Sequence, residues 1–275
     1  ELGIELYLKL DSTELFPTRS FKDRPVTMAF NKALEAGYEQ VFVASTGNLA
    51  ISTAYHSKET GIKCRVYVPK SLGEVKKGAI RKYFSSEDTL LELDLSYDDC
   101  NIKSMNDCEK VNEEEIKNGN KKTFVPNNSF RPYYKEGSKT AGSEIALQLD
   151  GKVPEDKPIN IFFPLGSGAL FCSAYKRINE LKKIGLYNNP VRMHGVQPEI
   201  CAPIINAIGK EDIEPVKNPQ TIAKSIAIGK PGSGHQSLAV IKESNGSGQK
   251  VSEADIFKST LELYFKEGIF SQFVG

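Results

Sequence analysis

The sequence holds few of the side chains that bind metal ions, since it has only three histidines and five cysteines in 275 residues. The histidines are scattered, and no two cysteines form a Cys-x-x-Cys pair, so the usual spacing of metal ligands is missing. We therefore expect no metal site. An odd number of cysteines without such spacing is typical of a reducing compartment, and we expect a cytoplasmic protein.

The chain also lacks an excess of charge and a long apolar run. Its 36 basic and 35 acidic residues give a net charge of +1, which offers no electrostatic attraction to nucleic acid or to an anionic membrane. No apolar stretch approaches the roughly 20 residues that span a bilayer. No signal peptide is visible, and because the chain begins with Glu1 rather than Met, we expect its native start to be absent.

What the sequence does contain is a repeated alternation of strand-like and helix-like segments. Short apolar runs predict strands at 4–10, 41–44, 64–68, 90–93, 123–125, 159–163 and 192–196. Longer patterns between them predict helices at 21–36, 48–60, 73–84, 98–117, 136–149, 168–184, 199–208, 235–244 and 252–267. This alternation predicts an α/β protein with mainly parallel sheets flanked by helices. The polar segment 151–158 is the expected linker between two halves, and 245–249 is expected to be a loop.

Three polar segments each follow a predicted strand. The first is Pro-Thr-Arg-Ser-Phe-Lys-Asp-Arg-Pro at 17–25, in which Lys22 lies one turn inside an expected helix. The second is Ser-Thr-Gly-Asn at 45–48, and the third is Pro-Leu-Gly-Ser-Gly-Ala-Leu at 164–170. Ligands of parallel sheets bind at the carboxyl ends of the strands, so we expect the three segments to converge there.

A lysine, a polar loop and a glycine loop are the three parts that a pyridoxal phosphate (PLP) enzyme needs. The lysine amine forms a Schiff base, and backbone N–H groups of a glycine loop hold the phosphate. Each part alone has a plainer interpretation, because Ser-x-Lys triplets are common, polar loops cap helices, and tight turns use glycine. A dinucleotide fingerprint is a poor match, because Phe171 stands where Gly-x-Gly-x-x-Gly needs its last glycine.

The order and wording of five blocks resemble the threonine synthase family of fold type II PLP enzymes. The blocks are residues 15–25, 44–50, 130–140, 164–170 and 194–204. The resemblance implies a two-domain α/β fold like that of the tryptophan synthase β subunit. It places residues 18–142 in a smaller domain with the lysine and the asparagine loop. Residues 1–17 and 143–275 then form a larger domain with the glycine loop.

The resemblance also implies a role for individual residues. Lys22 forms the Schiff base and then acts as acid and base, and Asn48 bonds the 3′-oxygen of PLP. The substrate is expected at Ser20, Ser45, Thr46, Gly47 and Arg131, with its carboxylate on the polar loop and its phosphate at Ser20 and Arg131. The PLP phosphate is expected on the loop of Gly166, Ser167, Gly168, Ala169 and Leu170.

The reaction implied is that of a carbon–oxygen lyase, in which O-phosphohomoserine and water give L-threonine and phosphate in a cytoplasmic homodimer. Two alternatives stay open. A cysteate synthase that uses O-phosphoserine and sulfite would share Lys22, Asn48 and the glycine loop, and an inactive paralogue would serve as a binding subunit. The sequence departs from the family at Arg19, where glycine is common. It also ends at Gly275, before an expected strand and helix, so we expect a fragment and assign no partner to the pyridine nitrogen.

Overall fold

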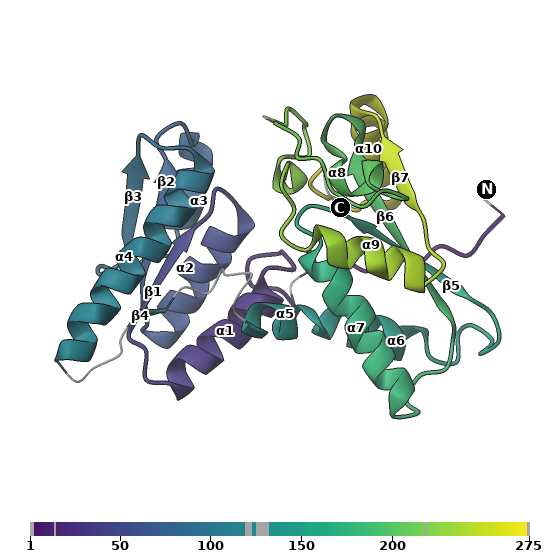
Figure 1. Cartoon of the computed structure of the whole chain (residues 1–275), viewed down its shortest axis with the longest axis horizontal. Helices are drawn as coiled ribbons and strands as arrows, with labels where there is room; N and C mark the ends of the chain where they lie inside the picture. The colour runs from purple at the N-terminus through teal and green to yellow at the C-terminus, as the bar shows by residue number, and fades with distance from the viewer. Residues whose placement is uncertain (1–2, 14, 119–122, 125–131, 218, 274–275) are drawn as a thin grey trace. The chain divides into compact units, whose positions relative to one another are not determined.

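The computed structural model describes residues 3–13, 15–118, 123–124, 132–217 and 219–273. The chain divides into two compact units, Glu1–Gly137 and Ser138–Gly275, each with its own sheet (Figure 1). The predicted partition, with residues 1–17 joined to the larger domain, concerns how the assembled protein is organised and stays a prediction.

The first unit is built on a parallel sheet in the order β3-β2-β1-β4. Its strands are β1 (Gln40–Ala44), β2 (Lys63–Pro69), β3 (Thr89–Leu93) and β4 (Thr123–Phe124). Its helices are α1 (Asp23–Glu35), α2 (Asn48–Thr60), α3 (Glu74–Arg81), α4 (Tyr97–Lys117) and α5 (Pro132–Ser138).

Both faces of this sheet are covered, as the sequence predicts. Alternate residues of a strand point to opposite faces, so Val41 and Val43 of β1 pack in a core with α1, α2 and α3. Phe42 and Ala44 lie in a second core with Cys100 and Cys108. The last two belong to α4, which runs along the sheet in Figure 1. The carboxyl end of β1 therefore opens between two packed layers, directly before α2.

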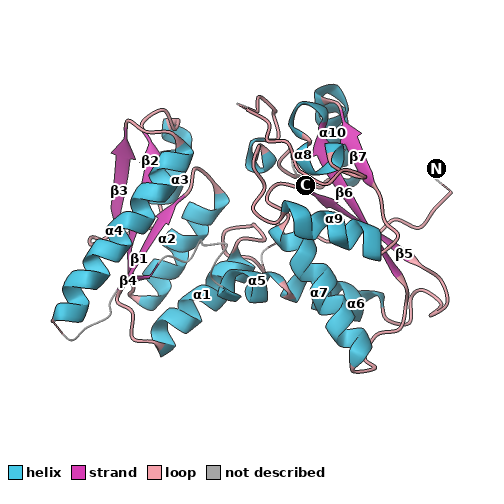
Figure 2. Ribbon diagram, in the orientation of Figure 1, coloured by secondary structure: helices cyan, strands magenta, loops and turns pink. Residues whose placement is uncertain are grey.

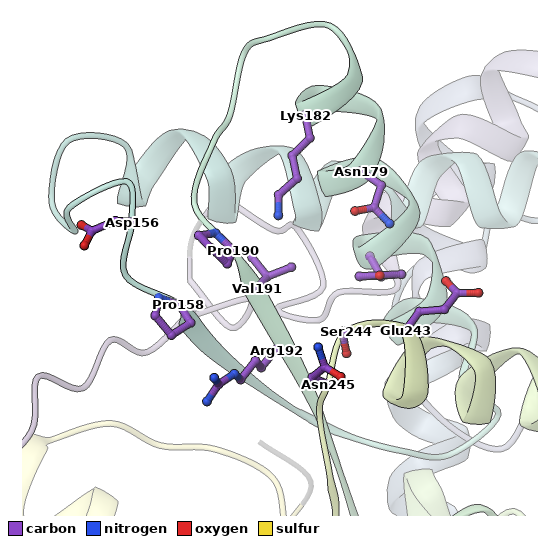
Figure 3. Close-up of a pocket in the computed structure, with 11 residues that line it drawn as sticks. Asp156, Pro158, Asn179, Lys182, Pro190, Val191, Arg192, Glu243, Ser244 and Asn245 are labelled. Carbon is purple, nitrogen blue, oxygen red and sulfur yellow. The ribbon is translucent and has the colours of Figure 1, made fainter.

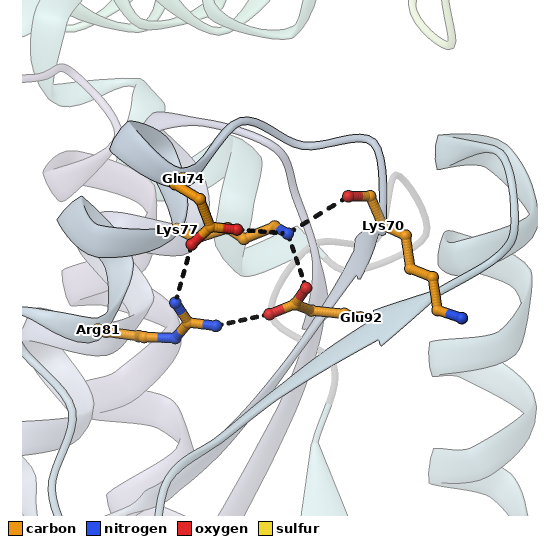
Figure 4. Close-up of polar contacts among 5 residues, drawn as sticks. All are labelled: Lys70, Glu74, Lys77, Arg81 and Glu92. Atoms are coloured by element: carbon orange, nitrogen blue, oxygen red, sulfur yellow. Dashed lines mark hydrogen bonds and ion pairs between the residues drawn. The ribbon is translucent and has the colours of Figure 1, made fainter.

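A buried lysine joins α3 to β3 in this unit. The Lys77 ammonium donates hydrogen bonds to Glu74 at 3.0 Å, to Glu92 at 2.6 Å and to the carbonyl of Lys70 at 3.3 Å (Figure 4). Arg81 reaches the same two carboxylates. The hydrogen bond and charge of Lys77 hold the pKa of Glu74 below its usual range. This network fixes α3 on the sheet edge, and its charges are satisfied within itself.

The second unit has a three-stranded parallel sheet in the order β5-β6-β7 (Figure 2). The strands are β5 (Ile159–Pro164), β6 (Val191–Pro198) and β7 (Gly248–Val251). The α-helices are α6 (Thr140–Leu149), α7 (Ala169–Lys183), α8 (Pro203–Asn206), α9 (Gly234–Glu243) and α10 (Glu253–Glu267), with 3-10 turns at Glu199–Cys201 and Lys224–Ile226. Ile161, Phe163 and Met193 of the sheet pack on α6, α7 and α9.

The expected strand at 4–10 is wrong. Its apolar residues alternate as in a strand, but the segment pairs with no described strand, and Ile4 and Leu6 are 69% and 62% exposed. A strand needs a neighbour to bond its backbone groups, which the alternation alone does not supply. The expected helix 136–149 is in fact two helices, α5 and α6, and 199–208 holds only a 3-10 turn and the short α8.

β7 is the strand that the sequence pattern conceals. Its first residues, Gly248 and Gln249, fall within the expected loop 245–249. Two glycines let this segment approach its neighbours closely. A Cβ on Gly246 would lie 1.8 Å from the carbonyl oxygen of Met193, and one on Gly248 would lie 2.5 Å from Ile208. Glycine in a strand commonly marks such an approach.

Candidate active site

Lys22 lies at the N-cap of α1, and not one turn inside it as predicted. Its backbone is already helical, with φ −62° and ψ −22°, and α1 begins at Asp23. The Lys22 N–H donates to the Ser20 hydroxyl oxygen at 3.3 Å, and Ser20 is buried. The lysine thus stands on a turn just before the first residue of α1.

Asp23 fixes the turn that carries Lys22. Its buried carboxylate accepts from the Thr18 N–H at 2.9 Å, from the Thr18 hydroxyl at 2.7 Å and from the Ser52 hydroxyl at 2.5 Å. Arg24 adds an ion pair with Asp11 at 2.7 Å. A carboxylate that accepts three hydrogen bonds is well satisfied in a buried place. The lysine turn is therefore rigid, and Ser52 ties it to α2.

α2 begins at Asn48, and Ser52, one turn further on, donates its hydroxyl to Asp23, the residue after Lys22. The segment 45–48 therefore lies at the same end of the unit as Lys22. Gly47 is the N-cap residue, and its N–H donates to the Ser45 hydroxyl at 3.3 Å. A Cβ on Gly47 would meet no atom within 4 Å. Open space beside the first N–H groups of a helix suits an anionic group such as a carboxylate. The structure thus brings together Lys22 and the polar loop.

Tyr134 of α5 is a neighbour of Lys22 that the sequence analysis did not single out. The Lys22 ammonium donates to the Tyr134 hydroxyl at 2.5 Å, and the ring of Phe21 lies 4.4 Å from the same nitrogen. The block 130–140 is one of those that carry the family resemblance, which implies a role for Arg131 alone. The only sign of this contact in the sequence is the pair of adjacent tyrosines at 133 and 134. Because Tyr134 lies 112 residues after Lys22, that pair does not indicate a contact with the lysine.

The glycine loop joins β5 to α7 in the second unit. Gly168 is the N-cap of α7 with φ +84°, and a Cβ there would lie 2.2 Å from the Ser237 hydroxyl. Ala169 donates its N–H to the Ser167 hydroxyl at 3.4 Å, and α7 continues through Leu170. Within the described chain, the N–H groups of residues 166–168 have no protein acceptor. These groups and the start of a 15-residue helix form a place for an anion.

Arg19, Arg131 and Lys139 are three basic residues of the blocks 15–25 and 130–140. Arg131 lies outside the described residues. Lys139 pairs with Glu180 at 2.7 Å and so has a structural partner. Arg19 is exposed and has φ +53°, a conformation that favours glycine. This conformation explains why glycine suits the position.

One pocket of about 440 Å³ lies in the second unit, away from the glycine loop (Figure 3). Its lining includes Asp156, Lys182, Arg192 and Glu243, at the amino ends of β5 and β6, whereas residues 166–170 follow the carboxyl end of β5. Charges of both signs line it, and two helices end beside it, where their negative poles favour cations. We do not assign it to the site. In the described parts of the chain no group of side chains could hold a metal ion, and no helix is long and apolar enough to cross a membrane.

Comparison with known proteins gives one family for nearly the whole chain. The model of a family described as "Pyridoxal-phosphate dependent enzyme" matches residues 1–274. The chain is 34% identical over 272 residues to a threonine synthase of Methanosarcina acetivorans, covering 98% of this chain and 62% of the relative. It is 33% identical to a threonine synthase of Methanocaldococcus jannaschii, with 98% and 63% covered, and 31% identical to one of a Bacillus species, with 99% and 70% covered.

Solved structures share the fold at lower identity. Threonine deaminase isoform 2 of Solanum lycopersicum superposes with a TM-score of 0.73 at 20% identity, covering 99% of this chain and 68% of that one. A fungal L-serine ammonia-lyase of Rhizomucor miehei gives a TM-score of 0.74 at 17% identity, with 94% and 75% covered. The chain spans slightly under two thirds of the length of the first two threonine synthases that it matches.

Proposed function

The chain belongs to the family of pyridoxal-phosphate dependent enzymes, and from this we propose that it carries the active-site residues of a threonine synthase. The proposed reaction converts O-phosphohomoserine and water to L-threonine and phosphate. The similarity to threonine synthases over 98% of the chain supports it. The single structural observation that carries it is a lysine amine on a rigid turn, tied through Asp23 and Ser52 to an open helix start.

The residues present fit PLP, each within its own unit. In the first unit Lys22 would offer the amine, and Asn48, the first residue of α2, would bond the 3′-oxygen. In the second unit the N–H groups of residues 166–168 would hold the PLP phosphate, with Ala169 and Leu170 beginning the helix behind them. When bound, PLP withdraws electrons from the substrate's α-carbon, which makes that carbon acidic.

The chain's own residues then bind the substrate and move its protons. We propose that Ser45, Thr46 and Gly47 hold the substrate carboxylate, because Gly47 leaves open space at the start of α2. The Lys22 amine takes the proton from the substrate's Cα and returns it later. Ser20 accepts the Lys22 N–H through its oxygen, so its own O–H is left to donate to the substrate phosphate together with Arg131.

The remaining features of the proposal concern the assembled protein. We propose a cytoplasmic homodimer in which the larger domain, residues 1–17 and 143–275, holds the PLP phosphate and the smaller domain, 18–142, holds Lys22. The family resemblance supports this arrangement. Sedimentation of the purified protein tests the homodimer, and a mass of one chain at micromolar concentration would rule it out.

The function is tested by incubating the PLP-loaded protein with O-phosphohomoserine and measuring threonine and inorganic phosphate together. We expect the two products in equal amounts. A parallel incubation with O-phosphoserine and sulfite checks for cysteate. Cysteate without threonine would assign the same residues to a cysteate synthase. Release of neither product by the full-length protein with PLP on Lys22 would contradict the proposed reaction.

A further inference from the structure

We propose that Tyr134 is the residue that holds the ε-amine of Lys22 in position for bonding to PLP. It holds the amine again when the substrate has displaced the amine from PLP. The inference rests on the role of Lys22 in the proposed function. It adds to the active site a residue from α5, a helix that the sequence analysis did not connect with the lysine.

The contact is a hydrogen bond from the Lys22 amine to the Tyr134 hydroxyl, and the amine also lies beside two aromatic rings. The Lys22 nitrogen lies 2.5 Å from the Tyr134 oxygen, 5.3 Å from the centre of the Tyr134 ring and 4.4 Å from that of Phe21. A lysine side chain has four rotatable bonds, and ordering it is unfavourable in the absence of a partner. Here a phenol and two aromatic rings restrict the amine to one place.

The packing of α5 on α1 keeps Tyr134 at that place. Gly137 is three residues after Tyr134 and so shares its face of the helix. A Cβ on Gly137 would lie 2.6 Å from the carbonyl oxygen of Arg24 and 2.7 Å from the Cα of Pro25. The absence of a side chain therefore lets α5 approach the first turn of α1, directly beside Lys22. This close backbone contact therefore keeps Tyr134 near the lysine.

A phenol suits an amine that must change its protonation state. The hydroxyl accepts a hydrogen bond from either form of the amine, and it donates to the lone pair of the neutral form. A carboxylate would favour only the ammonium, and in the described chain Lys22 forms no ion pair with one. In the covalent step the neutral amine nitrogen bonds the aldehyde carbon of PLP, and the aldehyde oxygen leaves as water with the amine's two hydrogens. Tyr134 is not consumed and only holds the nucleophile.

The test measures how fast PLP-free protein takes up PLP, in the absence of any substrate. Tyr134→Phe removes the hydroxyl and keeps the ring. Its control is Tyr133→Phe, which makes the same change at the adjacent tyrosine. The rise of the visible absorption band gives the rate, and borohydride reduction with peptide mapping gives the lysine. We expect Tyr134→Phe to load Lys22 up to about ten-fold more slowly, the upper end of the effect of one lost hydrogen bond, and the control to load at the parent rate.

Urea unfolding of the same variants separates positioning from folding. Tyr134→Phe should unfold close to the parent midpoint, whereas Gly137→Ala should both unfold earlier and load slowly, because its methyl group pushes α5 away from α1. Loading of Tyr134→Phe at the parent rate, with the label on Lys22, would overturn the inference and leave the proposed function standing. Label on another lysine in the parent protein would overturn both.

Discussion

Replacement of Gly168 by alanine should destabilise the second unit more than the same replacement at Gly185. Both glycines flank α7 and have positive φ, +84° and +72°. Their surroundings differ: a Cβ on Gly168 would lie 2.2 Å from the Ser237 hydroxyl and 3.1 Å from the Ser233 carbonyl oxygen, whereas one on Gly185 would meet nothing within 4 Å. The pair therefore separates the effect of backbone conformation from that of crowding.

The expected magnitudes follow from these two terms. An alanine forced into the left-handed region costs about 1–2 kcal/mol, which is the whole effect expected at Gly185. Overpacking adds about 1–3 kcal/mol at Gly168, so the total there is about 2–5 kcal/mol. Ser237→Ala removes the nearest atom, so in the double variant the cost of Gly168→Ala should shrink. What remains should be the conformational cost and the contact with Ser233.

Urea unfolding followed by circular dichroism measures the free energies of unfolding of the four variants. Equal losses for Gly168→Ala and Gly185→Ala, or no coupling between positions 168 and 237, would refute the reasoning. The result also bears on the glycine loop as a phosphate site. Gly168→Val should bind PLP weakly, but because the position excludes a side chain for reasons of packing, that loss alone does not demonstrate a cradle. Ser167→Ala should retain PLP, since backbone N–H groups are the proposed contacts.

Four further outcomes are expected. Burial lowers the pKa of His56, so the free energy of unfolding should fall as the pH drops through 6.5, the pKa of an unfolded histidine, and level off below the pKa of the folded state. In urea titrations His56→Gln should reduce this pH dependence. Lys77 lowers the pKa of Glu74, so the carboxylate stabilises the fold fully above pH 4.5 and loses this effect as the pH falls through the pKa of the folded state. Glu74→Gln should remove this loss of stability in acid. Arg19→Gly should raise the free energy of unfolding by about 0.5–1 kcal/mol, because it relieves a positive φ at the expense of backbone entropy. Arg131→Ala should lower kcat/KM for O-phosphohomoserine by about ten- to a hundred-fold and leave PLP uptake unchanged; normal turnover would place the phosphate elsewhere.

Periodicity predicted most of the fold because most elements are both buried and regular. The range 48–60 is α2 itself, and the short apolar runs 41–44 and 159–163 match β1 and β5 within one residue at each end. The failures arose where a distant partner decides the structure. Residues 4–10 have the pattern of a strand but no partner, and β7 has a turn-like sequence but finds an edge of β6 to pair with.

The candidate site shows the same division. The turn at Lys22 and the loops at 45–48 and 166–168 could be found from sequence because each lies in a continuous block. Tyr134 could not, because its contact with Lys22 depends on how closely α5 packs on α1 at Gly137. The hydrogen bond from Ser52 to Asp23 could not be predicted for a similar reason, since Ser52 lies 29 residues further along the chain.

The central claim is that Lys22 holds PLP covalently, and borohydride reduction of the PLP-loaded protein tests it most directly. Reduction makes the bond permanent, so that peptide mapping by mass spectrometry identifies the modified residue. We expect the label on Lys22, in the peptide that includes Phe21 and Asp23, and we expect Lys22→Ala to take up no reducible PLP. Label on a different lysine, or undiminished labelling of Lys22→Ala, would contradict the account.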